Sequence, residues 1–398
     1  MPRRVVITGI GPVSGIGVGV AEFGAGLRAG RSGVGPITSF DTTGFERFVA
    51  GEVRDFRPER FLRRLDAERW GRSALFAAVS ARLAMTDAGL DEAGPRMAVA
   101  VGTTGGEQVP FVEMIRAWHD QGPGVPDPRV AGKVAASRLG LAVARELGAS
   151  CEAVTLATAC AAGNYAIGHA FDLIALGEAD IAVAGGAESV GRFVHAGFHR
   201  LGALAAERCS PFDRDRSGIL VAEGGIALVL ESLDRALARG TRIYAEVLGY
   251  AMTCDARHPV APDAESIARC MRLAHKRSGI SPDQVDYICA HGTGTRVNDL
   301  VESTAVREVF GNQAPPMSSI KSMLGHTMGA ASGFGAAACA LSITQGFLPP
   351  TVNYRAADPE LPGVDPVANV SRAAEVTVAQ NNGFAFGGNN AIVMLGRI

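Results

Sequence analysis

Lysine is nearly absent from this chain, and neither sign of charge is in excess. Among its 38 basic residues the only lysines are Lys133, Lys276 and Lys321. The formal net charge is −2 and the isoelectric point is near 6.5. A chain this close to neutrality has no overall field that would attract it to nucleic acid or to a membrane surface. We therefore expect neither kind of partner.

Long hydrophobic runs are missing as well. No apolar stretch reaches the roughly 18 residues that a membrane span needs. The first residues, MPRRVVITGIGPVSGIG, lack the continuous apolar segment and the small-residue cleavage site of a signal peptide. The seven cysteines include no Cys-x-x-Cys pair, which argues against a disulfide framework and against a zinc site. We expect reduced thiols, no metal ion and a cytoplasmic location.

Glycine, in contrast, is plentiful. It accounts for 50 of 398 residues, well above the usual share of about 7%. These glycines follow no collagen period and form no low-complexity run, so they should mark turns and close backbone contacts. Apolar residues make up 47% of the chain, enough to bury a large core and to exclude disorder as the dominant state. The length suggests two or three domains.

Two internal repeats indicate a duplicated unit. Residues 81–105 align without a gap on residues 271–295, and both copies read as a helix, a turn, a short apolar strand and a Gly/Thr loop. Residues 218–230 align on residues 383–395, and both look like two apolar strands joined through a Gly/Asn-rich turn. Two matches in the same order favour duplication over chance.

Each repeat unit also contains a strand that leads into a helix rich in small residues. The strand, a candidate site residue and the helix are 152–158, Cys160 and 161–177 in the first unit, and 315–323, His326 and 329–346 in the second. Both helices are apolar nearly all round, so they should be buried between layers. Strands that alternate with helices are typical of parallel sheets covered on both faces. The sequence predicts an α/β protein of two similar halves, residues 1–240 and 241–398, without a flexible linker.

Cys160 is the candidate nucleophile. It lies where an apolar strand ends and a helix begins, among small neighbours that let a ligand approach. A helix N-terminus presents free N–H groups and a positive dipole end, which stabilise a thiolate and an oxyanion formed beside it. A free cysteine is otherwise most often a small buried hydrophobe. We interpret the remaining six in that way: Cys151, Cys209, Cys254, Cys270, Cys289 and Cys339.

Two histidines follow strands at candidate site positions. His291 opens the HGTGT loop, where the first repeat has Val101. His326 opens the second buried helix and is expected to take the place that Cys160 has in the first half. Ligands bind at such strand ends in α/β proteins, and neutral imidazoles there can donate a hydrogen bond to a carbonyl or assist proton transfer. A single buried histidine is often structural, but two beside a thiol favour a catalytic site.

Charged residues lie near both histidines in the sequence. Lys321 precedes His326 by five residues. A buried lysine needs a carboxylate or a carbonyl partner, and such a pair is expected to orient His326. Asp299 and Glu302 follow the HGTGT loop on a predicted helix; the alternative for these charges is a surface ion pair. The Gly-rich turn FAFGGNN, residues 384–390, is a candidate for backbone N–H groups that face the thiol.

Together these motifs resemble the elongating β-ketoacyl carrier-protein synthases, the ketosynthases of fatty-acid and polyketide assembly. The likeness covers nearly the whole chain and rests on TACAAGNYAIGHA, AGGAES, PFDRDRSGILVAEGGIALVLE, HGTGT, KSMLGHTMGAASG and GFAFGGNN. It implies the thiolase fold, with duplicated halves in a five-layered α/β/α/β/α arrangement. Two histidines distinguish this branch from the initiating synthases, which use His and Asn. Thiolases use a second catalytic cysteine instead.

The resemblance implies a role for each candidate residue. Cys160 would take an acyl group from a carrier-protein thioester, in the first step of a ping-pong reaction. His291 and His326 would bind the thioester carbonyl of a malonyl-type extender and promote its decarboxylation before Claisen condensation. Backbone N–H groups of Cys160 and Phe386 would form the oxyanion hole. Supporting and gating roles would fall to Lys321, Glu302, Asp299, Phe384, Gly387 and Gly388.

The resemblance also implies partners. No cofactor is expected, because substrates arrive on the phosphopantetheine arm of an acyl carrier protein. Such a carrier is acidic, so its docking site should be locally basic. The candidate is the segment 54–72, with seven arginines against four acids, and in particular Arg60, Arg63 and Arg64; the alternative is a solvated helix face. We expect a homodimer, with a heterodimer that includes a chain-length partner as the alternative.

Two residues depart from the family's gating loop, which usually reads Gly-Phe-Gly-Gly-Thr-Asn. Ala385 replaces the first Gly and should restrict the backbone, and Asn389 replaces Thr. These changes suggest a type II polyketide or specialised fatty-acid pathway. Two other functions stay open: an acyltransferase that passes the acyl group to an alcohol or amine, and a non-catalytic chain-length partner subunit. The two histidines with Lys321 favour condensation, and the intact Cys160 weighs against the partner subunit.

Overall fold

One mixed sheet runs through the whole molecule. The computed structural model describes residues 2–122 and 127–398. Ten strands lie in the order β6, β5, β7, β8, β1, β9, β15, β14, β10 and β11, and β2 (Gly17–Val18) pairs with β1. Their bounds are β1 (Val5–Ser14), β5 (Met97–Gly102), β6 (Ala153–Leu156), β7 (Ile181–Glu188), β8 (Gly224–Ser232), β9 (Ala245–Cys254), β10 (Tyr287–Cys289), β11 (Met317–Ser318), β14 (Val378–Phe384) and β15 (Asn389–Gly396).

The strand order repeats itself outward from the centre of this sheet. β1 and β9 pair antiparallel at the centre. Next on either side comes an antiparallel strand, β8 or β15, and then three mutually parallel strands, β7, β5 and β6 or β14, β10 and β11. This arrangement agrees with the repeat of 81–105 at 271–295. A division of the chain at residue 240 stays a prediction.

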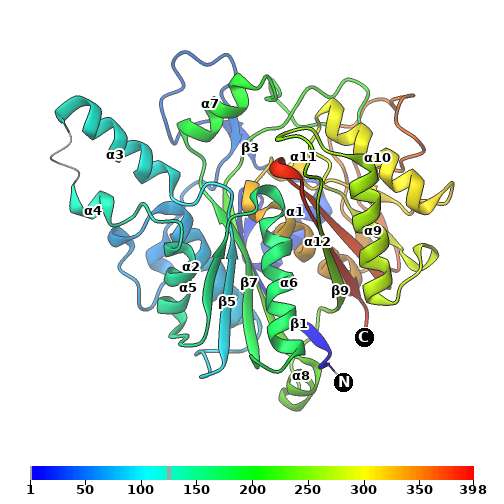
Figure 1. The fold of residues 1–398 in the computed structure, drawn as a ribbon, viewed down its shortest axis with the longest axis horizontal. Coiled ribbons are helices and arrows are strands. Elements are labelled where there is room, and N and C mark those ends of the chain that lie inside the picture. The colour runs from blue at the N-terminus through cyan, green and yellow to red at the C-terminus, as the bar shows by residue number, and fades with distance from the viewer. Residues whose placement is uncertain (1, 123–126) are drawn as a thin grey trace.

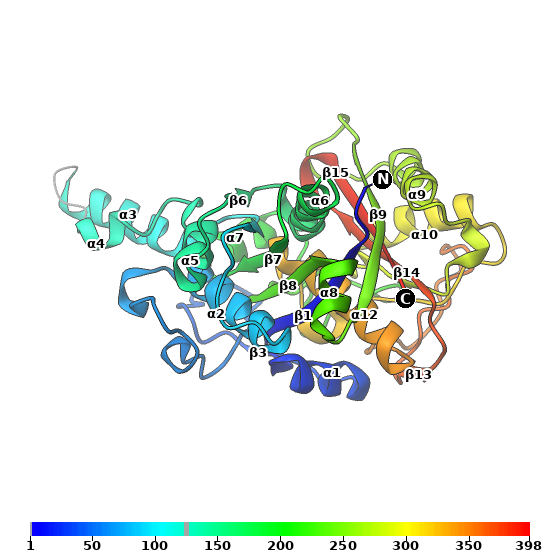
Figure 2. The ribbon, with the colours of Figure 1, turned by 90° about the horizontal axis from the view of Figure 1, so that it is seen from below.

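The helices form three layers, and the two halves of the sheet form the two layers between them. In Figures 1 and 2, α2 (Arg72–Asp87) and α5 (Arg138–Leu147) cover the outer face of the first half. α9 (Ala264–Ser278) and α10 (Arg296–Phe310) cover that of the second half, and α6 (Ala162–Ala175) and α12 (Ala331–Gln345) lie between the halves. The predicted five-layered α/β/α/β/α fold is confirmed. The remaining helices are α1 (Val20–Ala29), α3 (Gln108–Gln121), α4 (Pro128–Ala131), α7 (Arg192–Arg200), α8 (Leu233–Arg239) and α11 (Lys321–Leu324).

Apolar side chains fill the spaces between these layers. The largest cluster combines α6 and α12 with strands of both halves, and two further clusters lie under α2 with α5 and under α9 with α10. Where α6 and α12 cross, a Cβ atom on Gly163 would lie 2.5 Å from the backbone nitrogen of Gly333. The small residues predicted to be buried therefore allow two helix backbones to touch. Within the described residues, no helix is both long enough and apolar enough to cross a membrane.

Two local predictions were wrong. Residues 378–396 form the expected hairpin of β14 and β15, but its counterpart at 218–230 is a single strand, β8. Residues 218–223 make only isolated bridges there, because they pair one residue at a time with separate segments: Ile219 with Leu204, Val221 with His326 and Ala222 with Gly51. The strand expected at 315–323 is limited to Met317–Ser318, and Lys321 begins the short helix α11. Two small sheets, β3 (Val34–Pro36) with β4 (Val49–Gly51) and β12 (Phe347–Leu348) with β13 (Arg372–Ala373), lie apart from the main sheet.

Candidate active site

Cys160 lies in a tight turn between β6 and α6. Residues Ala159–Ala161 form a short 3-10 turn, and Ala159 has a φ of 48°. Residues other than glycine rarely adopt this backbone conformation. The corresponding turn before α12 is Met328–Ala330, and Met328 has a φ of 47°. The counterpart of Cys160 in the second half is therefore Gly329. The prediction that His326 takes this place is wrong, because His326 lies three residues earlier in the approach to the helix.

The two histidines nevertheless reach the thiol. Cys160, His291 and His326 line one cavity of about 90 Å³, and each is at most 6% exposed. The two imidazole ring centres lie 5.6 Å apart with nearly perpendicular planes. The Nδ1 atom of His326 accepts a hydrogen bond from the backbone N–H of Met328 at 3.1 Å. A neutral His326 therefore carries its proton on Nε2 and presents a donor.

Burial controls the charge of all three groups. It lowers the pKa of His291 and of His326 well below the ordinary histidine value, and the nearby Lys321 ammonium lowers both further. Both imidazoles are therefore neutral at neutral pH. Burial also raises the pKa of the Cys160 thiol to about 11, whereas Lys321 and the backbone N–H groups of Cys160 and Phe386 act in the opposite direction. The thiol of the free protein is protonated at neutral pH.

Glu302 and Lys321 hold the backbone of His291. The Glu302 carboxylate accepts the N–H groups of His291 and Gly292 at 2.8 and 2.7 Å. Lys321 Nζ donates to the carbonyl oxygen of His291. A buried Lys321 was expected to have either a carboxylate or a carbonyl partner, and its partner is a carbonyl. Its partner belongs to His291, so the expectation that it orients His326 is wrong, and the described residues include no ion pair between Lys321 and Glu302.

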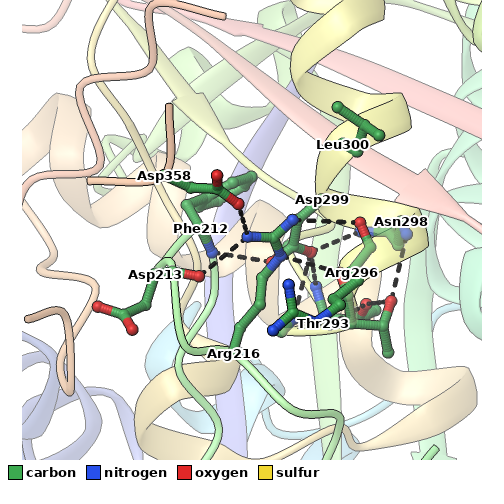
Figure 3. Close-up of polar contacts among 12 residues, drawn as sticks. Phe212, Asp213, Arg216, Thr293, Arg296, Asn298, Asp299, Leu300 and Asp358 are labelled. Atoms are coloured by element: carbon green, nitrogen blue, oxygen red, sulfur yellow. Dashed lines mark hydrogen bonds and ion pairs between the residues drawn. The ribbon is translucent and has the colours of Figure 1, made fainter. Parts of the chain in front are cut away.

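Asp299 holds the next residues of the same loop. Its carboxylate accepts the N–H groups of Thr293 and Gly294, and also that of Phe212, at 2.8 to 3.2 Å (Figure 3). Arg216 lies 3.7 Å away and is itself paired with Asp358. Burial raises the pKa of Asp299 to about 6. Neither Asp299 nor Glu302 lines the cavity, so both support the loop from behind.

The Gly-rich turn contributes Phe384, Ala385 and Phe386 to the cavity lining. Phe384 is buried with its ring centre 5.8 Å from that of His291, and Phe386 is 39% exposed against Phe198 at the rim. Gly387 and Gly388 have φ values of 80° and 76° and lie outside the cavity lining. Ala385 has a φ of −134°, which any residue adopts. The replacement of Gly by Ala therefore causes no strain in this conformation, and the expected restriction of the loop to fewer backbone conformations stays a prediction.

Sequence reasoning missed a buried carboxylate beside the thiol. Glu188, at the end of β7, accepts the N–H groups of Thr104, Gly105 and Gly329 at 2.7 to 3.2 Å. It is fully buried, and burial raises its pKa to about 7. It ties the start of α12 to the first half. The signal in the sequence is a glutamate in the AGGAES motif, at the end of the otherwise small and apolar stretch IAVAGGAE, and no role was assigned to it.

Other cavity residues were also missed. Phe198, Ala203, Ile219, Val260, Pro262 and Val297 line the same cavity. Ile219 lies within PFDRDRSGILVAEGGIALVLE and the other five lie outside the motifs, and no pattern in the sequence assigned any of them to the cavity. Within the described part of the chain, no three His, Cys, Asp or Glu side chains are placed to hold a metal ion.

The three arginines expected at the carrier docking site, Arg60, Arg63 and Arg64, are exposed and do not line this cavity. The segment that carries them forms two short 3-10 turns, Pro58–Arg60 and Ala67–Arg69, and no long helix. Arg63 pairs with Asp91 at 3.6 Å and Arg64 with Glu92 at 2.7 Å. Arg64 also borders a cleft of about 780 Å³ together with five further basic residues: Arg69, Arg129, Lys133, Arg138 and Arg145.

Comparison with known proteins gives the family. The model of the "Beta-ketoacyl synthase, N-terminal domain" matches residues 2–236, and that of the corresponding C-terminal domain matches residues 244–355. This chain belongs to the β-ketoacyl synthase family. Similar relatives include 3-oxoacyl-[acyl-carrier-protein] synthase 2 of Synechocystis, 39% identical over 98% of this chain and 96% of the relative. Nodulation protein E of a Rhizobium is 38% identical over 99% of both.

Solved structures of this family have the same fold. "The ishigamide ketosynthase/chain length factor" superposes with a TM-score of 0.97 and 49% identity over the whole of both chains. The ketosynthase of a type II polyketide synthase, in complex with its acyl-carrier protein, superposes with a TM-score of 0.91 and 33% identity, again over both chains completely. The predicted resemblance to ketosynthases is confirmed.

Replacement of Lys321 by Gln should move the acid limb of malonyl decarboxylation to higher pH. The Lys321 ammonium lowers the pKa of both imidazoles, so its removal raises these pKa values and the histidines protonate earlier as the pH falls. Gln keeps an amide donor for the His291 carbonyl. The pH profile of carbon dioxide release from a malonyl carrier thioester measures the shift, and an acid limb that stays in place would contradict this electrostatic role.

Proposed function

We propose that this protein is a β-ketoacyl carrier-protein synthase that joins an acyl group to a malonyl-type extender by decarboxylative Claisen condensation. The observation that carries the proposal is the cavity in which Cys160 faces His291 and His326, two imidazoles that burial keeps neutral. A neutral imidazole can donate a hydrogen bond to a carbonyl without bringing a positive charge into a buried site.

The first half of the reaction moves the acyl group to Cys160. The sulfur attacks the thioester carbonyl of an acyl carrier, the carbonyl oxygen becomes an oxyanion, and the carrier thiol leaves with the proton of Cys160. The N–H groups of Cys160 and Phe386 lie close enough to lower the pKa of the thiol, and they are the donors for that oxyanion. One such donor is typically worth about 10²–10³ in rate.

The second half consumes a malonyl-type thioester. His291 and His326 donate hydrogen bonds to its carbonyl oxygen, where charge develops as the bond to the carboxylate breaks and carbon dioxide leaves. The resulting carbanion attacks the acyl carbon on Cys160. The carbon–sulfur bond of the acyl-enzyme breaks, the Cys160 thiolate takes a proton from water, and a β-ketoacyl carrier thioester is released.

The partners follow from this chemistry. Both substrates would arrive on the phosphopantetheine arm of an acyl carrier protein, with no further cofactor, and residues 1–240 and 241–398 would each supply part of the site. A homodimer is proposed. A heterodimer with a chain-length partner is the second candidate, because a structural neighbour is described as a ketosynthase/chain length factor. A type II polyketide or specialised fatty-acid pathway is the proposed setting.

Incubation with acyl- and malonyl-carrier protein should give acylated Cys160, carbon dioxide and a β-ketoacyl product. Mass spectrometry of the protein and of the carrier follows all three, with Cys160→Ala as the control that cannot be acylated. Acylation without carbon dioxide would support an acyltransferase that uses an alcohol or amine. No acylation at all would support the non-catalytic partner subunit, and either result would overturn condensation.

We propose that the carrier docks at the basic cleft beside Arg60, Arg63 and Arg64. Six basic residues and three acids, Asp66, Glu68 and Asp127, line this cleft. The cleft therefore has a net positive charge, although the formal net charge of the whole protein is −2. An acidic carrier would be steered toward such a surface, mainly through its rate of association.

The double change Arg63→Glu and Arg64→Glu should raise the KM for carrier-bound substrate by about three- to tenfold and leave kcat nearly unchanged. Steady-state kinetics at low ionic strength measure this effect. Arg272→Glu is the matched control, because Arg272 is an equally exposed arginine, paired with Glu308, on α9 at the far side of the molecule. Equal changes in KM for both variants would contradict the docking site.

A further inference from the structure

A row of buried polar side chains connects α9 with the support of His291. His275 Nε2 lies 2.7 Å from Gln380 Oε1. Gln380 Nε2 donates to Asn382 Oδ1 at 2.8 Å, and Asn382 Nδ2 donates to Glu302 Oε1 at 2.9 Å. All four side chains are at most 4% exposed. Because an unpaired polar group at such depth is costly, every member of the row depends on its neighbours.

The row ends on the backbone of a cavity residue. Glu302 Oε1 also accepts the N–H of His291, and Oε2 accepts that of Gly292. His275, Gln380 and Asn382 themselves do not line the cavity. The hydrogen-bonded route from these three side chains to His291 runs through the Glu302 carboxylate.

The first half of the fold has apolar residues at the positions equivalent to this row, so the fold itself does not need polar side chains there. By the 190-residue offset of the repeat, His275 corresponds to Met85. The same offset relates Ile288 to Ala98. Ile288 pairs with Gln380 on the neighbouring strand, and Ala98 pairs with Ala182, so Ala182 is the counterpart of Gln380. The first-half positions are therefore apolar, with Met85, Ala182 and Ala184 in place of His275, Gln380 and Asn382. The polar row is present only in the half that contains His291.

Glu302 sets the direction of every hydrogen bond in the row. It is used as an acceptor by two backbone N–H groups, so Asn382 must present its NH₂ group to it. Asn382 then offers its oxygen to the NH₂ of Gln380, and Gln380 offers its oxygen to His275. His275 must therefore carry a proton on Nε2. Burial lowers its pKa, so it supplies this donor as a neutral imidazole.

We propose that His275 is a positioning residue for His291, acting through Gln380, Asn382 and Glu302. Its Nε2–H fixes the orientation of the two amides, and the last amide holds one oxygen of the Glu302 carboxylate. The carboxylate in turn holds the backbone at the start of the 291–294 loop. The part of this inference that concerns rate rests on the proposed condensing function. The part that concerns the backbone does not.

His275→Met, which restores the first-half residue, should slow malonyl decarboxylation roughly 10- to 100-fold, as expected when a reacting group is displaced slightly. Alkylation of Cys160 by iodoacetamide should change by less than about twofold, since Cys160 is held by other elements. His275→Gln keeps an amide donor at a similar reach and should restore most of the decarboxylation rate.

Hydrogen–deuterium exchange provides a readout that does not depend on activity. His275→Met should accelerate exchange of the His291 and Gly292 amides. The matched control is Phe310→Leu, which alters packing against the His275 ring, 5.4 Å from it, without removing a hydrogen bond. It should lower thermal stability and leave both readouts unchanged.

Unchanged exchange at His291 in His275→Met, or equal effects of Phe310→Leu, would overturn the proposal. If the unaltered protein releases no carbon dioxide, the condensing function fails, and the exchange experiment still decides the positioning role.

Discussion

The four consecutive backbone N–H groups of residues 291–294 donate hydrogen bonds to two buried carboxylates. Glu302 accepts the first two and Asp299 the last two. Backbone N–H groups at this depth must have partners, and a carboxylate that accepts two of them fixes the loop more firmly than neutral acceptors would. His291 can therefore stand inside the cavity although its loop has no regular structure. The rest of the site is arranged around this anchored loop.

The same depth sets the chemistry. Burial and the Lys321 ammonium keep both imidazoles neutral. The backbone N–H of Cys160, just before α6, offers a hydrogen bond to the sulfur without adding a charge to the site. The two central helices can meet here only because small residues let their backbones touch, as at Gly163 and Gly333. Part of the glycine content of the chain therefore lies where two buried helices cross closely beside the active site.

Much of this arrangement could be predicted from the sequence. The repeat and the helix periodicity indicated the layers, and a thiol and histidines at strand ends indicated one site. It was harder to predict which residues of the two halves occupy equivalent positions and which polar side chains are buried. Gly329 rather than His326 matches Cys160, because the match depends on which residue enters a 3-10 turn. Gln380 and Asn382 look like polar strand residues, and only the packing of α9 shows that they are buried. Glu188 belongs to the AGGAES motif, but nothing in the sequence shows that its carboxylate is buried and holds the start of α12.

The central claim is that burial keeps His291 and His326 neutral in a cavity shared with the thiol. Titration of the histidine Cε1 signals by NMR tests it most directly, with the signals of the eight histidines assigned through single His→Gln variants. Neither His291 nor His326 should gain a proton between about pH 8 and pH 6, across the ordinary histidine pKa. Protonation of either ring with a midpoint near or above the ordinary value would contradict it.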